Sequence, residues 1–113
     1  MQFLALIYET EDQFDTDFDT LLAQYGEFSS AAEEAGVMLG GNALQPVSTA
    51  TSVRVRESKS LLTDGPFAET KEQLAGYYLL DCKDLDEALI WAAKIPSARF
   101  GTIEVRPIMH FDE

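Results

Sequence analysis

The sequence has very little cysteine and histidine. In 113 residues there is one cysteine, Cys82, and one histidine, His110. A single cysteine cannot form a disulfide within the chain, which suits a reducing compartment. A zinc site needs three or four closely spaced Cys, His or carboxylate ligands, and the acidic residues do not follow EF-hand spacing. No glycine-rich phosphate loop is present. We therefore expect no metal and no other cofactor.

Positive charge is also scarce. Eight Lys and Arg residues stand against 20 Asp and Glu residues, so the formal net charge is −12 at pH 7. Nucleic acids and anionic membrane surfaces are bound by clustered Lys and Arg, so we expect neither as a partner. No apolar run is long enough to span a membrane. The short N-terminal apolar run lacks the basic residues of a signal peptide and is followed by Glu9, Glu11 and Asp12. These features predict a cytoplasmic protein.

What the sequence does contain is a pattern of apolar segments typical of a globular protein. Hydrophobic residues make up 46% of the chain, which is enough for one domain, residues 1–113, with a modest core. Apolar spacing of three and four residues predicts two helices, at about 15–35 and from 84 to the residue before Pro96. Alternating or continuous apolar runs predict strands at residues 3–8, 37–44, 50–56, 60–63, 76–82 and 100–111.

Several single residues mark the ends and irregularities of these elements. Gly36 is placed to end the first helix, and Asp84 to cap the start of the second, with Glu87 three residues later as in a capping box. The pair Gly40-Gly41 predicts a bulge or a close backbone approach within its strand. Pro107 lacks an N–H group, so the last strand should lie at a sheet edge or contain a bulge.

The two predicted helices can cover only one face of the sheet that the predicted strands form. The order is β-α-β-β-β-α-β with one extra strand around residue 60, which predicts an α+β protein with an antiparallel sheet and two helices on one face. Residues 3–8 and 76–82 are nevertheless apolar on both faces. A second copy of the chain can cover the second face, so the pattern predicts a homodimer with a self-complementary interface.

The segment of residues 61–81 is the most distinctive in the chain. It runs from two leucines through a polar turn, Asp64-Gly65-Pro66, to an apolar strand, and Phe67 places a large ring in the middle of that turn. Asp, Gly and Pro each favour a tight turn for a separate reason. The exposed-looking ring indicates a loop that folds down onto another part of the protein.

The decapeptide of residues 63–72, Thr-Asp-Gly-Pro-Phe-Ala-Glu-Thr-Lys-Glu, resembles the signature of the YCII-related proteins of the DGPF type. Residues 53–56 and 104–108 are similar in kind to this group, and the resemblance covers nearly the whole chain. It implies a ferredoxin-like α+β fold and a homodimer of the dimeric α/β barrel type. The resemblance also implies a His–Asp pair for acid/base chemistry on small organic acids. This sequence has no histidine in its first helix or second strand, where such a pair would place it.

The polar residues of the signature are the first candidates for a site. Asp64 is either an acid, base or hydrogen-bond acceptor held over a pocket, or a turn residue whose carboxylate accepts backbone N–H groups. Glu69, Lys71 and Glu72 either line the same pocket or form a solvated cluster that pairs with itself.

Five further residues complete the set of candidates. Arg54 shares a strand face with Arg56, and their two positive charges are balanced either by nearby carboxylates or by an anionic ligand. The adjacent Tyr77 and Tyr78 should send one ring to each face of the sheet, and one hydroxyl could then line a cleft. The lone His110 is either a surface or interface residue or part of the pocket.

Two functions are compatible with these residues. The first is a cofactor-free acid/base enzyme of the isomerase or lyase type, with a pocket between the sheet, the first helix and residues 64–71. Asp64 would exchange protons there, and Arg54 and Lys71 would orient a small organic acid. The second is a non-catalytic dimeric module that binds a metabolite or a protein partner.

Overall fold

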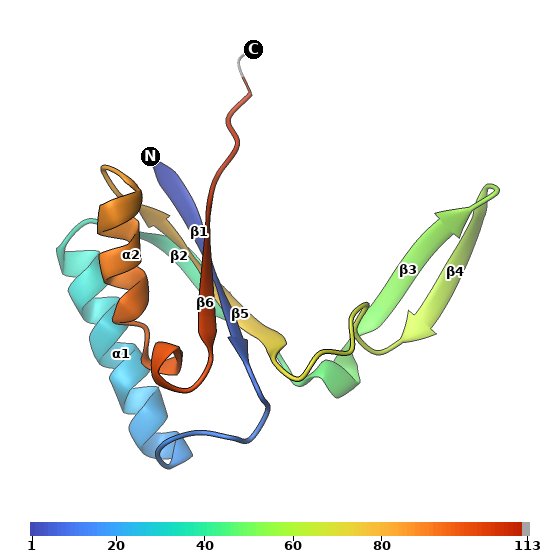
Figure 1. The fold of residues 1–113 in the computed structure, drawn as a ribbon, viewed down its shortest axis with the longest axis horizontal. Coiled ribbons are helices and arrows are strands. Elements are labelled where there is room, and N and C mark those ends of the chain that lie inside the picture. Colours follow the sequence, from blue (N-terminus) through green and yellow to red (C-terminus); the bar gives the residue numbers. More distant parts are fainter. Residues whose placement is uncertain (112–113) are drawn as a thin grey trace.

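The computed structural model describes residues 1–111, which form a four-stranded sheet, two helices and a separate hairpin (Figure 1). The elements in chain order are β1 (Gln2–Glu9), α1 (Phe18–Glu34), β2 (Met38–Ala43), β3 (Thr51–Arg56), β4 (Lys59–Asp64), β5 (Gln73–Asp81), α2 (Leu85–Ala93) and β6 (Thr102–Pro107). Two 3₁₀ turns, Val47–Thr49 and Pro96–Arg99, precede β3 and β6.

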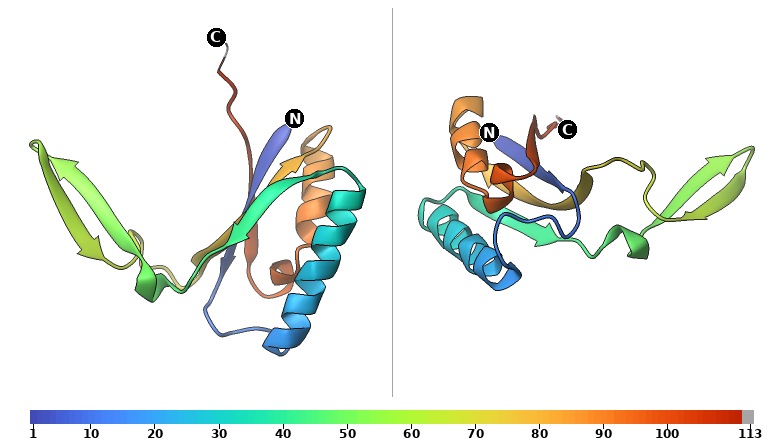
Figure 2. Two further views of the ribbon diagram at one scale, coloured as in Figure 1. Left: turned by 180° about the vertical axis from the view of Figure 1, so that it is seen from behind. Right: turned by 60° about the horizontal axis from the view of Figure 1, so that its bottom comes forward.

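The main sheet has the strand order β2-β5-β1-β6, and every neighbouring pair is antiparallel. Without the β3–β4 hairpin the order along the chain is β-α-β-β-α-β, which is the arrangement of ferredoxin-like folds. Both helices lie against one face of the sheet (Figure 2). The predicted α+β class and the predicted covering of one face by two helices are therefore confirmed.

The core lies between the helices and one face of the sheet. Phe3, Ala5 and Ile7 of β1 alternate with partly exposed residues and are buried beneath the helices. They pack with buried residues from β5 and both helices, among them Leu80, Phe28, Ala32 and Ala88. Leu4, Leu6 and Tyr8 of β1 lie on the opposite face, which no element within residues 1–111 covers.

Helix α1 begins slightly later than predicted. Asp17 is its N-cap, and the Asp17 carboxylate accepts the backbone N–H of Thr20 at 2.7 Å. The predicted start near residue 15 is corrected to Phe18, because the carboxylate of Asp17 satisfies an N–H group that the helix itself leaves free. Gly36 follows the C-cap with φ of 75°, as predicted for the residue that ends the helix.

Helix α2 is capped as its sequence predicts, with one difference. The Asp84 carboxylate accepts the backbone N–H of Glu87 at 2.9 Å. In a standard capping box the side chain of Glu87 would reach back to the N–H of the cap. Here it accepts instead from the N–H of Lys83, one residue earlier, at 3.1 Å.

Strand β6 is shorter than the predicted 100–111. Phe100 still belongs to the end of the preceding 3₁₀ turn, where its N–H bonds the carbonyl of Ser97, so the strand starts only at Thr102. It ends at Pro107, although the N–H of Ile108 still bonds the carbonyl of Gln2 at 2.8 Å. The predicted edge position is confirmed, because β6 is the last strand of the sheet order. The predicted irregularity in β2 is also present, as a register shift between Met38 and Gly40.

Strands β3 and β4 form a sheet of their own instead of extending the main sheet. They are joined by a two-residue turn, Glu57-Ser58, in which both residues have positive φ, 51° and 65°. This is the turn geometry that suits a tight hairpin. Figure 1 shows the hairpin and the helices on opposite sides of the main sheet. None of the helices in residues 1–111 is long and apolar enough to cross a membrane.

Candidate functional site

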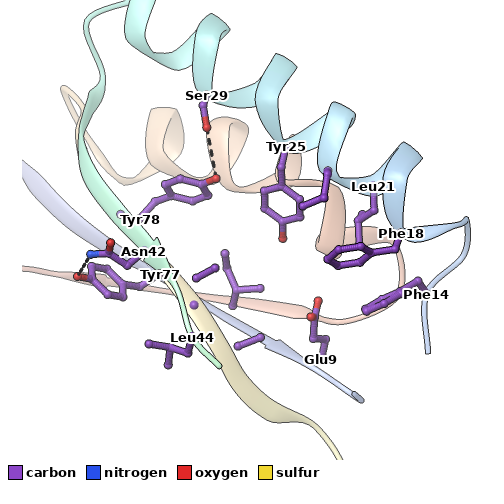
Figure 3. Close-up of a pocket in the computed structure, with 16 residues that line it drawn as sticks. Glu9, Phe14, Phe18, Leu21, Tyr25, Ser29, Asn42, Leu44, Tyr77 and Tyr78 are labelled. Carbon is purple, nitrogen blue, oxygen red and sulfur yellow. Dashed lines mark hydrogen bonds between the residues drawn. The ribbon is translucent and has the colours of Figure 1, made fainter. Parts of the chain in front are cut away.

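A pocket of about 440 Å³ lies between α1 and the main sheet (Figure 3). This volume is within the range of about 300–1,000 Å³ typical of small-molecule sites. Most of the lining is aliphatic or aromatic, and Glu9 is the one Asp, Glu, Lys, Arg or His residue among the described residues that line it. The lining consists of Ile7, Glu9, Phe14, Phe18, Leu21, Leu22, Tyr25, Ser29, Gly41, Asn42, Ala43, Leu44, Ala75, Gly76, Tyr77 and Tyr78.

Local structure explains why these side chains reach the pocket. The alternation of β1 places Glu9 on the same face as Phe3, Ala5 and Ile7, beneath the helices. Helical spacing of four residues places Leu21, Tyr25 and Ser29 on one side of α1. Phe14 and Phe18, whose ring centroids lie 6.2 Å apart, add aromatic surface at the start of α1.

One wall of the pocket depends on a glycine in β2. A Cβ atom on Gly41 would lie 2.5 Å from Cδ1 of Tyr78 and 2.7 Å from the carbonyl oxygen of Tyr77. These distances are too short for any side chain. The Tyr78 ring can therefore lie flat over β2 only because residue 41 has no side chain.

A chain of hydrogen bonds links the two sides of the pocket. The hydroxyl of Ser97 donates to Oε2 of Glu9 at 2.7 Å. Since a carboxylate only accepts and Ser97 has one hydroxyl proton, Tyr25 must donate its own proton to Oγ of Ser97. Ser97 is the one buried polar residue of the described chain, with 1% of its surface exposed. The chain therefore connects the phenol of α1 to the carboxylate at the end of β1.

The surroundings of Tyr25 hold its phenol in the neutral form. Burial raises the pKa of Tyr25 to about 12, and the nearby charge of Glu9 acts in the same direction. The hydrogen bond with Ser97 opposes this shift but does not outweigh it. At physiological pH Tyr25 is thus a protonated hydroxyl whose oxygen faces an apolar pocket.

Tyr78 and Tyr77 point to opposite faces of the sheet, as predicted. The Tyr78 ring lies on the helix side, 5.1 Å from Phe28 and 6.4 Å from Tyr25 between centroids. Its hydroxyl is 3.4 Å from Oγ of Ser29. The hydroxyl of Tyr77 accepts from Nδ2 of Asn42 at 2.8 Å (Figure 3). Tyr78 is therefore the tyrosine of this pair whose ring packs with the helices at the pocket.

An ion pair ties down the segment before α1. The guanidinium of Arg99 bonds both carboxylate oxygens of Asp15, at 2.7 and 3.0 Å, and Oε1 of Gln24 at 2.7 Å. The bond from Arg99 lowers the pKa of the Asp15 carboxyl below its usual value. Phe14 lies next to Asp15 and also packs edge-on against Phe100, with centroids 5.7 Å apart. The pair therefore fixes the aromatic end of the pocket.

The structure brings only one of the six predicted site residues, Tyr78, to this pocket. The pocket does lie between the sheet and the first helix, as predicted, but residues 64–71 contribute nothing to its lining. Asp64 ends β4 and is exposed, Lys71 and Glu69 are exposed in the following loop, and His110 is exposed beyond β6. Asp64 lies at the end of the hairpin, which extends away from the main sheet, and Glu69 and Lys71 lie in the loop between the hairpin and β5. A site that uses these residues stays a prediction.

Asp64 and Arg54 also lie apart from each other. The hairpin register pairs Asp64 with Thr51 and Arg54 with Leu61, so the two charged side chains are on opposite faces. The guanidinium of Arg54 sits 5.0 Å from the centre of the Phe67 ring, a cation–π contact. Phe67 is nevertheless 76% exposed, so the expected folding of this ring onto another part of the chain is wrong within one protomer.

The residues that sequence reasoning missed are Glu9, Tyr25 and Ser97. Glu9 continued the buried alternation of β1, which was a usable signal, and Tyr25 lay in the apolar stripe of α1. Ser97 carried no local signal, because its burial comes entirely from tertiary packing. Within residues 1–111 no group of three or more His, Cys, Asp or Glu side chains is arranged to hold a metal ion.

The fold and pocket together define a class, a ferredoxin-like α+β protein with an apolar pocket between its sheet and its first helix. The chain belongs to the family of the YCII-related domain, whose model matches residues 1–112. It is also 46% identical over 77 residues to an uncharacterised protein of Rhizobium meliloti. That match covers 66% of this chain and 62% of the relative, so the chain spans less than two thirds of that relative's length.

Proposed function

We propose that this protein binds a small, largely apolar molecule in the pocket beneath α1 and transfers a proton within it without a cofactor. The observation that supports this is the hydrogen-bonded chain of Tyr25, Ser97 and Glu9 at the edge of an otherwise apolar cavity. An acid and a base on two sides of one cavity are the requirement for moving a proton between two positions of a ligand.

The geometry supplies a closed path for such a transfer. The hydroxyl of Ser97 donates a hydrogen bond to Oε2 of Glu9, so Oε1 is the oxygen that would take a proton from a bound molecule. Tyr25, protonated at neutral pH, donates its proton to the oxygen or carbon of the ligand that gains it. The Glu9 carboxyl group then turns to present its proton to Oγ of Ser97, and Ser97 passes its own hydroxyl proton to the Tyr25 phenolate. The enzyme ends as it began, and the ligand has undergone an isomerisation.

The lining also restricts the ligand. A carboxylate group placed near Glu9 would meet a like charge, and no Lys or Arg is among the described residues that line the pocket. The pocket of one chain therefore favours a molecule without negative charge at that end, such as a small ketone or lactone. The small organic acid expected from the sequence remains a prediction that requires a cation from outside this lining.

A binding role without turnover has support of its own. The pKa of Tyr25 is raised to about 12, and its hydroxyl already donates a hydrogen bond to Ser97, so Tyr25 is a weak acid in the resting protein. In that case the same pocket would hold a ligand by apolar contact and a single hydrogen bond. The two functions differ in what Glu9 does, and a substitution there separates them.

The test uses cyclohexanone, 2-cyclohexenone and δ-valerolactone as probes in D2O. Amide chemical shifts of Gly41, Ala43 and Gly76 report binding in the pocket, and proton NMR follows protein-dependent deuteration of the probe. We expect Glu9→Gln to abolish deuteration while binding remains, and Glu27→Gln, on an exposed position of α1, to change neither. Binding without deuteration in the wild type would leave only the binding role. Absence of binding for every neutral probe would refute both.

A further inference from the structure

A second cavity of about 260 Å³ adjoins the first at the end of the main sheet where β1 stops. The two cavities share five lining residues, Glu9, Phe14, Phe18, Leu44 and Ala75, so they are neighbours across a common boundary. In Figure 3, Glu9, Phe14 and Phe18 lie at the end of the first cavity away from Tyr78. The second cavity lies beyond that end, and the proposed proton path does not use it.

Three segments of the chain meet to form the second cavity. The N–H of Leu44 bonds the carbonyl of Ala75 at 2.8 Å, just beyond the end of β2. The N–H of Val47 then donates to Oε1 of Glu11 at 3.0 Å, which joins the segment after β2 to the loop after β1. The first residues of β5 form the third side. These bonds hold the cavity open in a defined shape.

A bulge in β5 shapes the boundary between the two cavities. Ile7 pairs with Gly76 and Tyr8 with Leu74, so Ala75 has no partner in β1. In a regular strand the side chains of consecutive residues point to opposite faces. Here Leu74 and Ala75 both line the second cavity, and Ala75 also lines the first. The bulge therefore puts a small residue where a ligand would pass from one cavity into the other.

The lining of the second cavity is mainly apolar and is not covered within the described chain. Its apolar members are Phe14, Phe18, Leu44, Pro46, Val47, Leu74 and Ala75. Phe18, Leu44 and Leu74 are 57%, 46% and 37% exposed. Covering such side chains with an apolar group is favourable in proportion to the area removed from water. An aliphatic part of a ligand is the group that suits this surface.

The charged members of the lining limit the ligand further. They are Glu9, Glu11 and Asp12, and no Lys or Arg is among the described residues that line the second cavity. A chain that ends in a carboxylate would meet like charges there. Glu9 lines both cavities, so the part of the ligand that reacts with Glu9 lies where they meet. A chain in the second cavity must therefore leave the ligand close to its reacting group.

We propose that the ligand spans both cavities and is a ketone or lactone with a short aliphatic chain beside its carbonyl group. The carbonyl group lies next to Glu9, the rest of the head fills the first cavity, and the chain occupies the second. The chain does not end in a carboxylate. This inference rests on the proposed function, because it takes the reacting group to be bound in the first cavity. It adds a second binding subsite and a narrower substrate class.

The first test compares cyclohexanone with 2-butylcyclohexanone, whose chain is on the carbon next to the carbonyl. Both ketones should shift the amide resonances of Gly41, Ala43 and Gly76, and only the butyl ketone should also shift those of Val47 and Leu74. With the butyl chain about half buried, we expect its dissociation constant to be at least about tenfold lower. Cyclohexanone with a propanoate chain at the same carbon should bind more weakly than cyclohexanone.

The second test narrows the second cavity without touching the first. Val47 lines only the second cavity, and its recorded hydrogen bond is made by its backbone, so Val47→Phe fills space there and keeps that bond. The advantage of the butyl ketone should fall below about threefold, and the dissociation constant of cyclohexanone should not change. Val55→Phe, the same substitution at an exposed position of the hairpin, is the matched control and should alter neither constant.

The results distinguish this inference from the proposed function. A butyl ketone that binds less than about threefold tighter than cyclohexanone, or shifts neither Val47 nor Leu74, would refute the second subsite and leave the proposed function standing. An advantage that survives Val47→Phe would also refute it, because the chain would then lie elsewhere. If neither ketone binds, both the proposed function and this inference fail. The shifts in the wild type decide the question even if Val47→Phe does not fold.

Discussion

Replacement of Ser97 tests the hydrogen-bonded chain on which the proposed function depends. Ser97 is almost completely buried, donates to the carboxylate of Glu9 at 2.7 Å and accepts from the hydroxyl of Tyr25. Ser97→Ala removes both interactions and leaves a void no larger than one oxygen atom. The free energy of unfolding therefore reports the hydrogen bonds with little contribution from lost packing.

The expected magnitude follows from what each partner can do afterwards. A hydrogen bond to a charged group contributes about 1.5–3 kcal/mol, and an unsatisfied buried hydroxyl costs about 1–3 kcal/mol. Glu9 is only partly buried, so water can replace the lost hydrogen bond to its carboxylate. The cost of losing that bond therefore lies at the lower end of the first range. Tyr25 is also only partly exposed. We expect Ser97→Ala to lower the free energy of unfolding by about 2 kcal/mol.

Urea denaturation measures this change with a built-in probe. Trp91 is the only tryptophan in the chain, and its ring packs edge-on against Phe28 with centroids 6.2 Å apart. A loss of about 2 kcal/mol lowers the urea midpoint by roughly 1 M for a small protein. Measurements at two protein concentrations separate this change from any change in association. Ser30→Ala, on the exposed side of α1, is the matched control and should not lower the midpoint.

A double-mutant cycle decides whether the three residues act as one chain. Tyr25→Phe alone keeps the bond from Ser97 to Glu9 and should cost about 1 kcal/mol. In the Tyr25→Phe background, Ser97→Ala leaves no unpaired phenol, so its cost should fall by about 1 kcal/mol. Strict additivity of the two substitutions, or a cost of Ser97→Ala below about 0.5 kcal/mol, would refute the chain of hydrogen bonds and the proton path built on it.

Three further predictions concern the helices and the phenol. Gly26→Ala should raise the free energy of unfolding by about 1 kcal/mol, because Gly26 is exposed within α1 and an added Cβ meets no atom within 4 Å; thermal unfolding checks this. Asp84→Ala should lower it by about 1 kcal/mol through loss of the N-cap, whereas Asp86→Ala should change it by only a few tenths. The pKa of Tyr25 is raised to about 12 from about 10 in an unfolded chain. Stability should therefore fall as the pH rises from 10 to 12, and Tyr25→Phe should remove that part of the fall.

The parts of the fold that follow local rules were predictable from the sequence. Asp84 caps α2 and Gly36 ends α1 because both effects depend on a few neighbouring residues. Pro107 marked an edge strand because a missing N–H excludes a central position. The start of α1 was predicted less well, since several residues before it are acceptable caps, and the structure places Asp17, in extended backbone conformation, at the cap.

The site was predicted less well because it depends on distant packing. The sequence identified the hairpin but not its direction, and a register within β3–β4 contains no information about where the pair lies relative to the main sheet. Asp64 was predicted as a site residue because it is a charged residue in a distinctive turn motif. The residues that line the cavity are mostly apolar and do not stand out in the sequence. Glu9 was detectable by its alternation with Phe3, Ala5 and Ile7, but a single acidic residue at a strand end is also a common way for a strand to stop.

The signature segment still affects the pocket, through the backbone and not through its polar side chains. The carbonyl of Lys71 accepts from Oγ1 of Thr10 at 3.2 Å, and the residue after Glu72, Gln73, pairs with Glu9 at the end of β1. The carboxylate of Glu72 also accepts from the hydroxyl of Thr102 at 3.0 Å. The end of this loop therefore holds the end of β1, which is where the Glu9 carboxylate enters the cavity. A change in the loop would act on the pocket by displacing Glu9, even though no loop residue lines it.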